Sequence, residues 1–396
     1  MIIGDTMKFI EDMHLKNKTV ILRCDYNVPI KNGKILDDSK IVKSLETIQY
    51  LLSKNCKIII LSHLGRVKSE EDKKNNTLQP VKYRLEELLE TEVTFVVDVF
   101  NVPLETNNKI ILLENTRCYD FPEKKESSND LELAKGWAKL ADVFIFDAFG
   151  SAHRAHASTA GISKYLPTGI GYLVKEELTN LEKVQKNPKK PFIVVMGGAK
   201  VDDKIPLIKS LLPSCNYLLL GGGIANSFLK AKEVNIGKSL ATDDESILNE
   251  LKLLLELYKE KLILPSDVCV KNKEEISYKG INTLSDDDSI FDIGTKTINK
   301  YSSLLSEAET VFMNGTMGLY EEKEFASGTL GIFETLTNVP VVIIGGGDTV
   351  GAVNKLGFEE KFILSSGGGA SLEYIAKGKL EALEEIEKNE DEKISL

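Results

Sequence analysis

The segment DAFGSAHRAHAST, Asp147 to Thr159, groups side chains that could bind a metal, transfer protons or hold an anion. It contains two of the four histidines of the chain, His153 and His156, and one of its five arginines, Arg154. A metal pair is disfavoured, because the histidines straddle a cation and no spaced cysteine or histidine completes a ligand set. Acid–base catalysis by the histidines and anion binding by Arg154 remain as interpretations.

Arginine is rare in this sequence and restricted to its first half. The five arginines stand beside 45 lysines that are spread along the whole chain. An arginine kept in such a lysine-rich chain is expected where a planar fork must bind phosphate or carboxylate. Chance or an ordinary surface ion pair is the alternative, and it is the interpretation for Arg84 in the helical pattern VKYRLEELLE. The candidates for an anion site are Arg23, Arg66, Arg117 and Arg154.

Charge and composition exclude several classes of protein. Residues 1–174 contain 24 basic and 24 acidic residues, whereas the remainder contains 26 and 36 and accounts for the net charge of −10. A chain this acidic is not expected to bind nucleic acid. No apolar run reaches the ~18 residues of a membrane span, and the first residues lack a signal-peptide core, so a cytoplasmic protein is expected. The five cysteines form no CxxC pair, which favours buried reduced thiols.

Short apolar runs recur along the sequence, each ending at a polar residue or glycine and followed by a helical pattern. Continuous apolar strands that alternate with helices predict parallel sheets covered on both faces. The predicted fold class is therefore α/β, with two doubly wound, Rossmann-like parallel-sheet domains. The runs of the first half are TVILRCD (19–25), KIIILSH (57–63), TFVVD (94–98), KIILLEN (109–115) and DVFIFD (142–147). Those of the second half are FIVVMGGAK (192–200), YLLLGGG (217–223), TVFMNGTMG (310–318), VVIIGGGD (341–348) and FILSSGGG (362–369).

A single helix is expected to join the two domains. The stretch VKEELTNLEKVQKNP has apolar residues at helical spacing and ends at Pro188. Two charged segments, SEEDKKNNT (69–77) and PEKKESSND (122–130), are predicted to be solvated loops. The last residues have the pattern of an acidic amphipathic helix. The predicted division is a first domain at 1–173, the joining helix at 174–188, a second domain at 189–380 and a helical tail at 381–396.

The two halves carry different residues at the ends of their predicted strands. Ligands of open parallel sheets bind outside the carboxyl ends of the strands. The first half places arginines, Asp25 and His63 at these ends, which suits a small molecule with several negative charges. The second half places glycines there, and glycine lets backbone N–H groups and a helix N-terminus approach phosphate, as in a nucleotide site. The Walker A, protein-kinase and GxGxxG patterns are all missing from the sequence, so such a site must be of another kind.

A series of motifs along nearly the whole chain resembles the phosphoglycerate kinase family. The motifs occur in the order of the family, and such a series is far more specific than any one glycine cluster. In the first half they are DYNVP (25–29), SHLGR (62–66), LLENTR (112–117) and DAFGSAHRAHAST (147–159). In the second half they are GGAKVDDKI (197–205), LLLGGGIANSFLKA (218–231), NGTMG (314–318), FASGT (325–329), GGGDT (345–349) and SSGGGAS (365–371).

The resemblance implies a kinase that moves a phosphoryl group reversibly between 1,3-bisphosphoglycerate and ADP, forming 3-phosphoglycerate and MgATP. The implied cofactor is Mg²⁺, the implied partners are these small molecules, and a monomer is expected because a closing two-domain enzyme needs no second copy. Substrate binding is implied for Asp25, Tyr26, Asn27, Lys40, His63, Leu64, Gly65, Arg66, Arg117 and Arg154. Catalytic roles are implied for Lys40, Lys200, Lys204, Gly367 and Gly368. Nucleotide binding is implied for Lys204, Gly294, Glu321, Gly346, Gly347, Asp348 and Thr349, and metal binding for Asp348.

This reaction needs no general base, because both nucleophiles, an ADP phosphate oxygen and the carboxylate of 3-phosphoglycerate, are already ionised near neutral pH. It needs alignment, cations and the exclusion of water, which closure of two domains on a hinge supplies. The implied hinge elements are the joining helix and the segment from Ser365 to Ser371. Arg154 is therefore interpreted as part of a phosphate clamp with Arg66 and Arg117, and the histidines as its supports.

One departure from the family pattern concerns chemistry. The motif that usually reads DD-T-R-I is DDSKI here, so Lys40 takes the place of an arginine and keeps the charge without the bidentate fork. Milder departures are Met313, Thr316, Asp202 and Val67, and an LPGV segment near the C-terminus is missing. Two alternatives stay open: a non-catalytic anion- or nucleotide-binding protein of the same fold and, less favoured, an NAD-dependent dehydrogenase.

Overall fold

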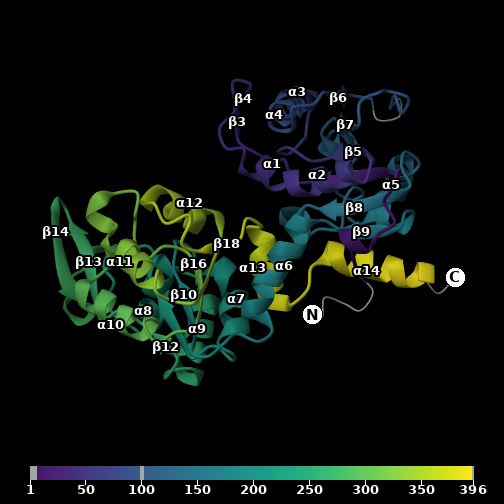
Figure 1. The fold of residues 1–396 in the computed structure, drawn as a ribbon. Helices are drawn as coiled ribbons and strands as arrows, with labels where there is room; N and C mark the ends of the chain where they lie inside the picture. The colour runs from purple at the N-terminus through teal and green to yellow at the C-terminus, as the bar shows by residue number, and fades with distance from the viewer. Residues whose placement is uncertain (1–6, 99–101, 395–396) are drawn as a thin grey trace. The chain divides into compact units, whose positions relative to one another are not determined.

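The computed structural model describes residues 7–98 and 102–394, and it divides into two compact units (Figure 1). The first unit comprises the described residues up to Thr179 together with those from Lys379 onward. The second unit comprises Asn180–Gly378. Each unit is built on its own parallel sheet, so the predicted fold class of two Rossmann-like α/β domains is confirmed. Among the described residues, no helix has both the length and the apolar character needed to cross a membrane.

The sheet of the first unit has seven strands in the order β1-β9-β8-β2-β5-β7-β6, and every neighbouring pair is parallel. The central strands are buried on both faces, which is why they read as unbroken apolar runs in the sequence. The strands are β1 (Lys8–Phe9), β2 (Thr19–Cys24), β5 (Lys57–Leu61), β6 (Val93–Val96), β7 (Ile110–Leu113), β8 (Val143–Asp147) and β9 (Thr168–Ile170). A separate hairpin pairs β3 (Ile30–Lys31) with β4 (Lys34–Ile35).

Helices supply the rest of the first unit's core. One face of the sheet, with Val20 and Leu22 of β2, packs with buried residues of the helices that follow β2 and β5. The helices and 3-10 turns are η1 (Ile10–Asp12), α1 (Ser39–Lys43), α2 (Leu45–Ser53), α3 (Glu70–Asn75), α4 (Gln79–Leu89), η2 (Thr116–Asp120), α5 (Leu131–Ala138), η3 (Phe149–Ser151) and η4 (Gly161–Lys164). Side chains alternate along a strand, so Arg23 of β2 lies on the face opposite Leu22.

The prediction of a loop at 69–77 is wrong, because this segment forms α3. The Ser69 side chain accepts a hydrogen bond from the Asp72 amide and caps the helix. Acidic residues occupy the first turn and lysines the last, which matches the helix dipole and stabilises a helix without a buried face. Residues 122–130 contain no helix or strand, but Glu126 within them is fully buried and therefore not solvated.

The second unit contains a six-stranded parallel sheet in the order β12-β11-β10-β16-β17-β18. Its strands are β10 (Phe192–Met196), β11 (Tyr217–Leu220), β12 (Leu262–Ile263), β16 (Thr310–Asn314), β17 (Val341–Gly345) and β18 (Ile363–Leu364). Its helices and 3-10 turns are η5 (Asp202–Lys204), α7 (Ile205–Leu211), α8 (Gly222–Ala231), α9 (Glu245–Leu257), η6 (Ile281–Thr283), α10 (Thr295–Leu305), η7 (Lys323–Phe325), α11 (Ser327–Leu336), α12 (Gly347–Leu356) and α13 (Gly369–Lys377). Tyr301, Phe333 and Val353 from three of these helices pack with the strands in its core.

A three-stranded antiparallel sheet in the second unit was not anticipated from the sequence. It consists of β13 (Asp267–Asn272), β14 (Glu275–Gly280) and β15 (Ser289–Ile293), in the order β14-β13-β15. β14 is mostly exposed and polar, so it lacks the apolar run by which the other strands were identified. Residues of β15 also line the cavity of the second unit.

The predicted joining helix is present as α6 (Tyr172–Gln185). The Asp147 carboxylate accepts a hydrogen bond from the Val174 amide at 3.1 Å and caps its first turn. The division between the units falls within this helix, between Thr179 and Asn180. The predicted C-terminal helix is α14 (Glu381–Ile394), which belongs to the first unit (Figure 1). There the Asn389 side-chain amide donates to the Ser163 hydroxyl at 2.8 Å.

Candidate active site

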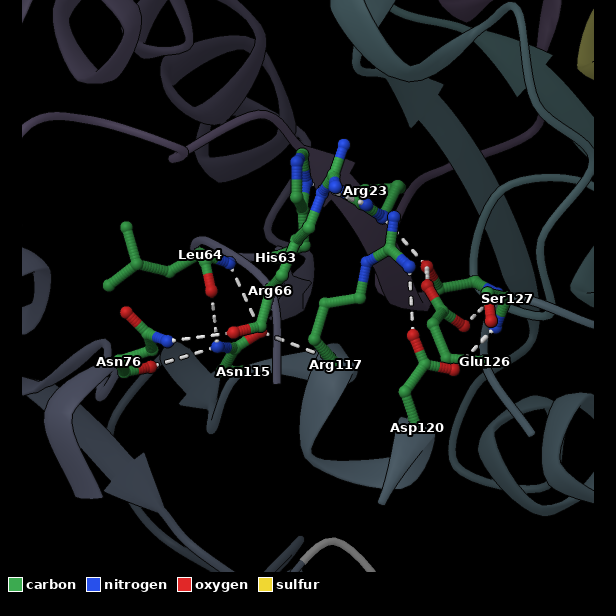
Figure 2. Close-up of polar contacts among 11 residues, drawn as sticks. Arg23, His63, Leu64, Arg66, Asn76, Asn115, Arg117, Asp120, Glu126 and Ser127 are labelled. Carbon is green, nitrogen blue, oxygen red and sulfur yellow. Dashed lines mark hydrogen bonds and ion pairs between the residues drawn. The ribbon is translucent and has the colours of Figure 1, made fainter. Parts of the chain in front are cut away.

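The cationic residues of the first unit lie at the carboxyl-terminal edge of its sheet. Arg23 is near the end of β2, His63 follows β5, and Arg117 lies in η2 after β7. Figure 2 shows these three side chains and Arg66 in one cluster. Arg154 lies after β8 and η3, and its side chain is exposed, like that of Arg66. Arg84 is not part of this cluster: its guanidinium pairs with Asp38 and Glu87 at 2.8 and 2.7 Å, the surface pairing expected from its helical pattern.

Asp25 and Asn27 are held next to this cluster by a short network. The Asn27 amide and the Lys40 ammonium donate to the two Asp25 carboxylate oxygens at 3.0 and 3.1 Å. The Asn27 side-chain oxygen in turn accepts from the Gly65 amide at 3.0 Å. Burial alone would raise the pKa of Asp25, but the neighbouring His63 and Lys40, the Asn27 amide and Arg23 together lower it, so the carboxylate is ionised. Tyr26 points away into the core, where its hydroxyl meets Ser44 at 2.9 Å.

Asn115 belongs to the LLENTR motif, but no role was predicted for it from the sequence. It connects two loops of the cluster. Its side-chain oxygen accepts from the amides of Leu64 and Arg117, each at 3.0 Å. Its side-chain amide donates to the Leu64 carbonyl at 2.7 Å, and the residue is fully buried (Figure 2). The Arg117 guanidinium then pairs with Asp120 at 2.8 Å, with both side chains largely buried. A single buried asparagine thus fixes two of the segments that carry candidate site residues.

The histidines of the cluster are neutral at neutral pH. Burial lowers the pKa of His63 to about 3, and Arg23, Arg117 and Lys40 act in the same direction against Asp25. Burial likewise lowers the pKa of His156 to about 3, together with Arg117, Arg23 and Arg154. The positive charge that meets an anion here therefore comes from arginine and lysine.

The second unit contains a cavity of about 890 Å³ at the carboxyl ends of its strands. Glycines following β10, β11, β16 and β17 and preceding α13 line it. Gly346 and Gly368 are the N-cap residues of α12 and α13 and have φ angles of 90° and 52°, which only glycine adopts readily. A Cβ atom at Gly347, Gly368 or Gly369 would meet nothing within 4 Å, so the backbone of these helix starts is open to a ligand. Two helix N-termini at one cavity favour an anion such as phosphate.

Lys204 is the half-buried cation of this cavity. Its ammonium donates to the Asn314 side-chain oxygen, and the Asn314 amide donates to the Gly345 carbonyl at 2.6 Å. Burial lowers the pKa of Lys204, whereas Asp203 and Asp348 raise it. Lys200 also lines the cavity, with an exposed side chain.

The other predicted nucleotide residues divide into two groups. Glu321, Gly346, Gly347, Asp348 and Thr349 line the cavity, and the Thr349 hydroxyl accepts from the Gly315 amide at 2.7 Å. Gly294 and Gly367 are not among the lining residues, and a Cβ atom at Gly294 would lie 2.3 Å from the Asp267 carboxyl group. Four apolar side chains of the lining were missed from the sequence: Leu240, Ile290, Phe291 and Leu319. Ile290 and Phe291 belong to the unexpected strand β15.

A metal ion in this cavity would need further ligands from a bound substrate. Within residues 7–98 and 102–394, no three His, Cys, Asp or Glu side chains form a group that could hold an ion. Asp348 offers one exposed carboxylate in the first turn of α12, beside the open amides. Mg²⁺ is commonly bound by one or two carboxylates together with substrate phosphates, so the donor set fits that ion.

These observations define a class of protein: a two-domain α/β protein with an arginine-rich anion site in one unit and a glycine-lined nucleotide-type cavity in the other. The chain belongs to the phosphoglycerate kinase family, whose model, "Phosphoglycerate kinase", matches residues 10–379. A phosphoglycerate kinase of Macrococcus caseolyticus is 44% identical over 392 residues, covering 96% of this chain and 98% of that protein. One of Enterococcus faecalis is 45% identical over 394 residues, covering 96% and 98%.

Solved structures agree with this assignment. The structure of phosphoglycerate kinase from Coxiella burnetii has a TM-score of 0.88 and 36% identity, covering 98% of this chain and 100% of that one. The enzyme from Pyrococcus horikoshii gives a TM-score of 0.81 and 29% identity with the same coverage. The resemblance inferred from the motif series is therefore confirmed.

Proposed function

We propose that this protein transfers a phosphoryl group reversibly between 1,3-bisphosphoglycerate and ADP, forming 3-phosphoglycerate and MgATP. The observation that supports this most is the pairing of two different anion sites within one chain of this family. One site presents guanidinium groups and an ionised Asp25, and the other presents open helix N-termini and Lys204. A carboxyl group is the proposed acceptor, and a cytoplasmic location and a monomeric state remain predictions.

In this proposal the first unit binds the glycerate substrate. Arg66, Arg117 and Arg154 hold the phosphate that is not transferred, because planar guanidinium groups match its oxygens. Asp25 and Asn27 bind the glycerate hydroxyl and carboxyl end, together with neutral His63 as a hydrogen-bonding group. Lys40 stabilises the negative charge that develops on the transferring group.

The second unit is proposed to bind the nucleotide. Thr349 and the open amides after Gly346 hold its phosphates, Lys204 neutralises the transferring phosphoryl group, and Glu321 meets the ribose. The base lies against the apolar lining with Phe291. A bound Mg²⁺ ion, held by Asp348, would neutralise phosphate charge and orient the oxygens. The N-terminus of α13, capped by Gly368, faces the phosphoryl group during transfer.

The proposed mechanism depends on alignment and charge. Phosphoryl transfer passes through a loose transition state whose charge lies on the equatorial oxygens, so cations and N–H donors lower its energy. No side chain has to remove a proton. This agrees with the low pKa values of His63 and His156, which leave both rings neutral and weakly basic. Since the two substrates bind to different units, transfer requires a step that brings the units together and excludes water.

A coupled assay with 3-phosphoglycerate and MgATP tests the proposal. The expected result is 1,3-bisphosphoglycerate formation that depends on ATP, detected as NADH oxidation by an added glyceraldehyde-3-phosphate dehydrogenase. NADH turnover without ATP and without the coupling enzyme would favour a dehydrogenase instead. Binding of both substrates by calorimetry without any turnover would identify a non-catalytic binding protein.

A further inference from the structure

A chain of buried polar contacts runs from the substrate cluster to a loop that the proposed mechanism does not use. Arg23 is 1% exposed, although it is a cation. Its Nε donates to the Ser158 hydroxyl at 2.9 Å, and one outer nitrogen donates to its neighbour, the Cys24 carbonyl. The Ser158 hydroxyl donates onward to the Glu126 carboxylate, and the Ser158 amide donates to the same carboxylate at 3.0 Å. All of these groups belong to the first unit.

Glu126 is the carboxyl group at the far end of this chain. It is fully buried in a segment without helix or strand, where a carboxylate has a high desolvation cost. Burial raises its pKa above the usual range, although Arg23, both hydrogen bonds from Ser158 and Arg117 each act to lower it. Glu126 also raises the pKa of Arg23 against the effect of burial. The Ser158 hydroxyl has one proton, which it donates to Glu126, so its oxygen accepts the hydrogen bond from Arg23.

At its other end the chain reaches a residue of the proposed substrate site. The remaining outer nitrogen of Arg23 lies 3.3 Å from Nδ1 of His63. A guanidinium can only donate, so Nδ1 must accept and cannot bear the ring proton. In a neutral imidazole the proton is then on Nε2, where it can be donated to an oxygen of the substrate.

We propose that Glu126, acting through Ser158, is a positioning residue: it anchors Arg23 so that this arginine holds His63 in the Nε2–H form. The inference rests on the proposed function, because it assigns His63 a donor role towards the glycerate substrate. Glu126 itself touches none of the reacting groups. Glu126 is the largest of the negative charges that favour the Arg23 cation, ahead of Asp25. Without it the buried guanidinium is less well compensated, and Arg23 holds His63 less firmly.

The test compares Glu126→Gln with a matched control in the same segment. Glu123→Gln also removes one negative charge, but Glu123 is 69% exposed and pairs with Lys125. For Glu126→Gln the KM for 3-phosphoglycerate is expected to rise roughly tenfold, while the KM for MgATP stays unchanged. Glu123→Gln is expected to leave both constants unchanged.

A structural role alone would not change the ring form of His63, so the second measurement is proton–nitrogen NMR of the histidine rings. The chain has only four histidines, and a His63→Gln variant assigns the signal. The unmodified protein should show His63 protonated on Nε2, and folded Glu126→Gln or Ser158→Ala should show both ring forms. Protonation on Nδ1 in the unmodified protein overturns the proposal even if neither variant folds. So does a KM for 3-phosphoglycerate, or a His63 spectrum, that is unchanged in the folded variants. An unmodified protein without kinase activity refutes the proposed function. The NMR result still decides whether Glu126 and Ser158 control the ring form of His63.

Discussion

Removing the Lys40 ammonium should lower the turnover number with little effect on the KM for MgATP. Lys40 stands on the short helix α1 and pairs with Asp25 at 3.1 Å through a single nitrogen. The loss of one donor to a developing oxyanion typically costs ~2.7–4 kcal/mol, or about 10²–10³ in kcat. The Lys40 side chain is 31% exposed and has no bidentate fork, so Lys40→Ala is expected at the lower end, about 10².

The assay is the coupled reaction at saturating substrates, with Lys43→Ala as the control. Lys43 lies on the same helix, is exposed and has the same charge, so its removal should leave kcat unchanged. Lys40→Arg should be neutral or faster, because a guanidinium restores the fork usual at this position of the family. A turnover number for Lys40→Ala equal to that of the unmodified enzyme would refute the assignment.

A second outcome separates direct catalysis from an effect through Asp25. Lys40 is one of the groups that lower the pKa of Asp25, so its loss raises that pKa. If the rate were lost only because Asp25 becomes protonated, raising the pH would restore Lys40→Ala to full activity. A deficit that persists at high pH places the effect on the transferring group.

Three further predictions concern the second unit and the helix that joins the units. Lys204→Ala should lower kcat by about 10² or more while the KM for 3-phosphoglycerate is unchanged in steady-state assays, and a normal kcat would contradict its role. Chelation by EDTA should abolish turnover, and Asp348→Asn should raise the Mg²⁺ concentration needed for half-maximal rate roughly tenfold; an unchanged Mg²⁺ requirement would exclude Asp348 as a ligand. Burial raises the pKa of Asp147 to about 7, so the folded state holds its proton more tightly than the unfolded state. The resulting stability is present below pH ~4 and is lost as the pH rises through about 7, by at most about 4 kcal/mol. Asp147→Asn keeps an acceptor for the Val174 amide, so thermal unfolding at pH 5 and pH 8 should show a smaller loss of stability than in the unmodified protein; an equal loss would contradict this assignment.

Much of the fold could be predicted because parallel strands buried on both faces leave a local signal. Runs such as FIVVM and VVIIG are continuous, and each became a strand of the expected sheet. The signal failed where stability came from other sources. Helix α3 has no buried residue and depends on its Ser69 cap and charge pattern, and β14 is largely exposed.

The candidate site was predictable to the extent that its residues stand at strand ends in recognisable motifs. The sequence placed Arg117 and His63 at one sheet edge and the glycines at another, since the edge follows from the order of parallel strands. The partners of these residues could not be predicted in this way. Asn115 joins two motif segments, and Phe291 reaches the cavity from an unpredicted strand.

The sequence by itself determined the class of fold, the family and the separation of an arginine-rich half from a glycine-rich half. Periodicity and motif order are properties of neighbouring residues, so one chain suffices to establish them. Only the tertiary structure decided that Lys40 faces Asp25, that Asn314 holds Lys204 and that Ser158 links Glu126 to Arg23. The contacts of Lys204 with Asn314 and of Arg23 with Ser158 join residues 110 and 135 positions apart. They depend on how strands and loops pack, because the burial that makes a polar contact specific exists only in the folded chain.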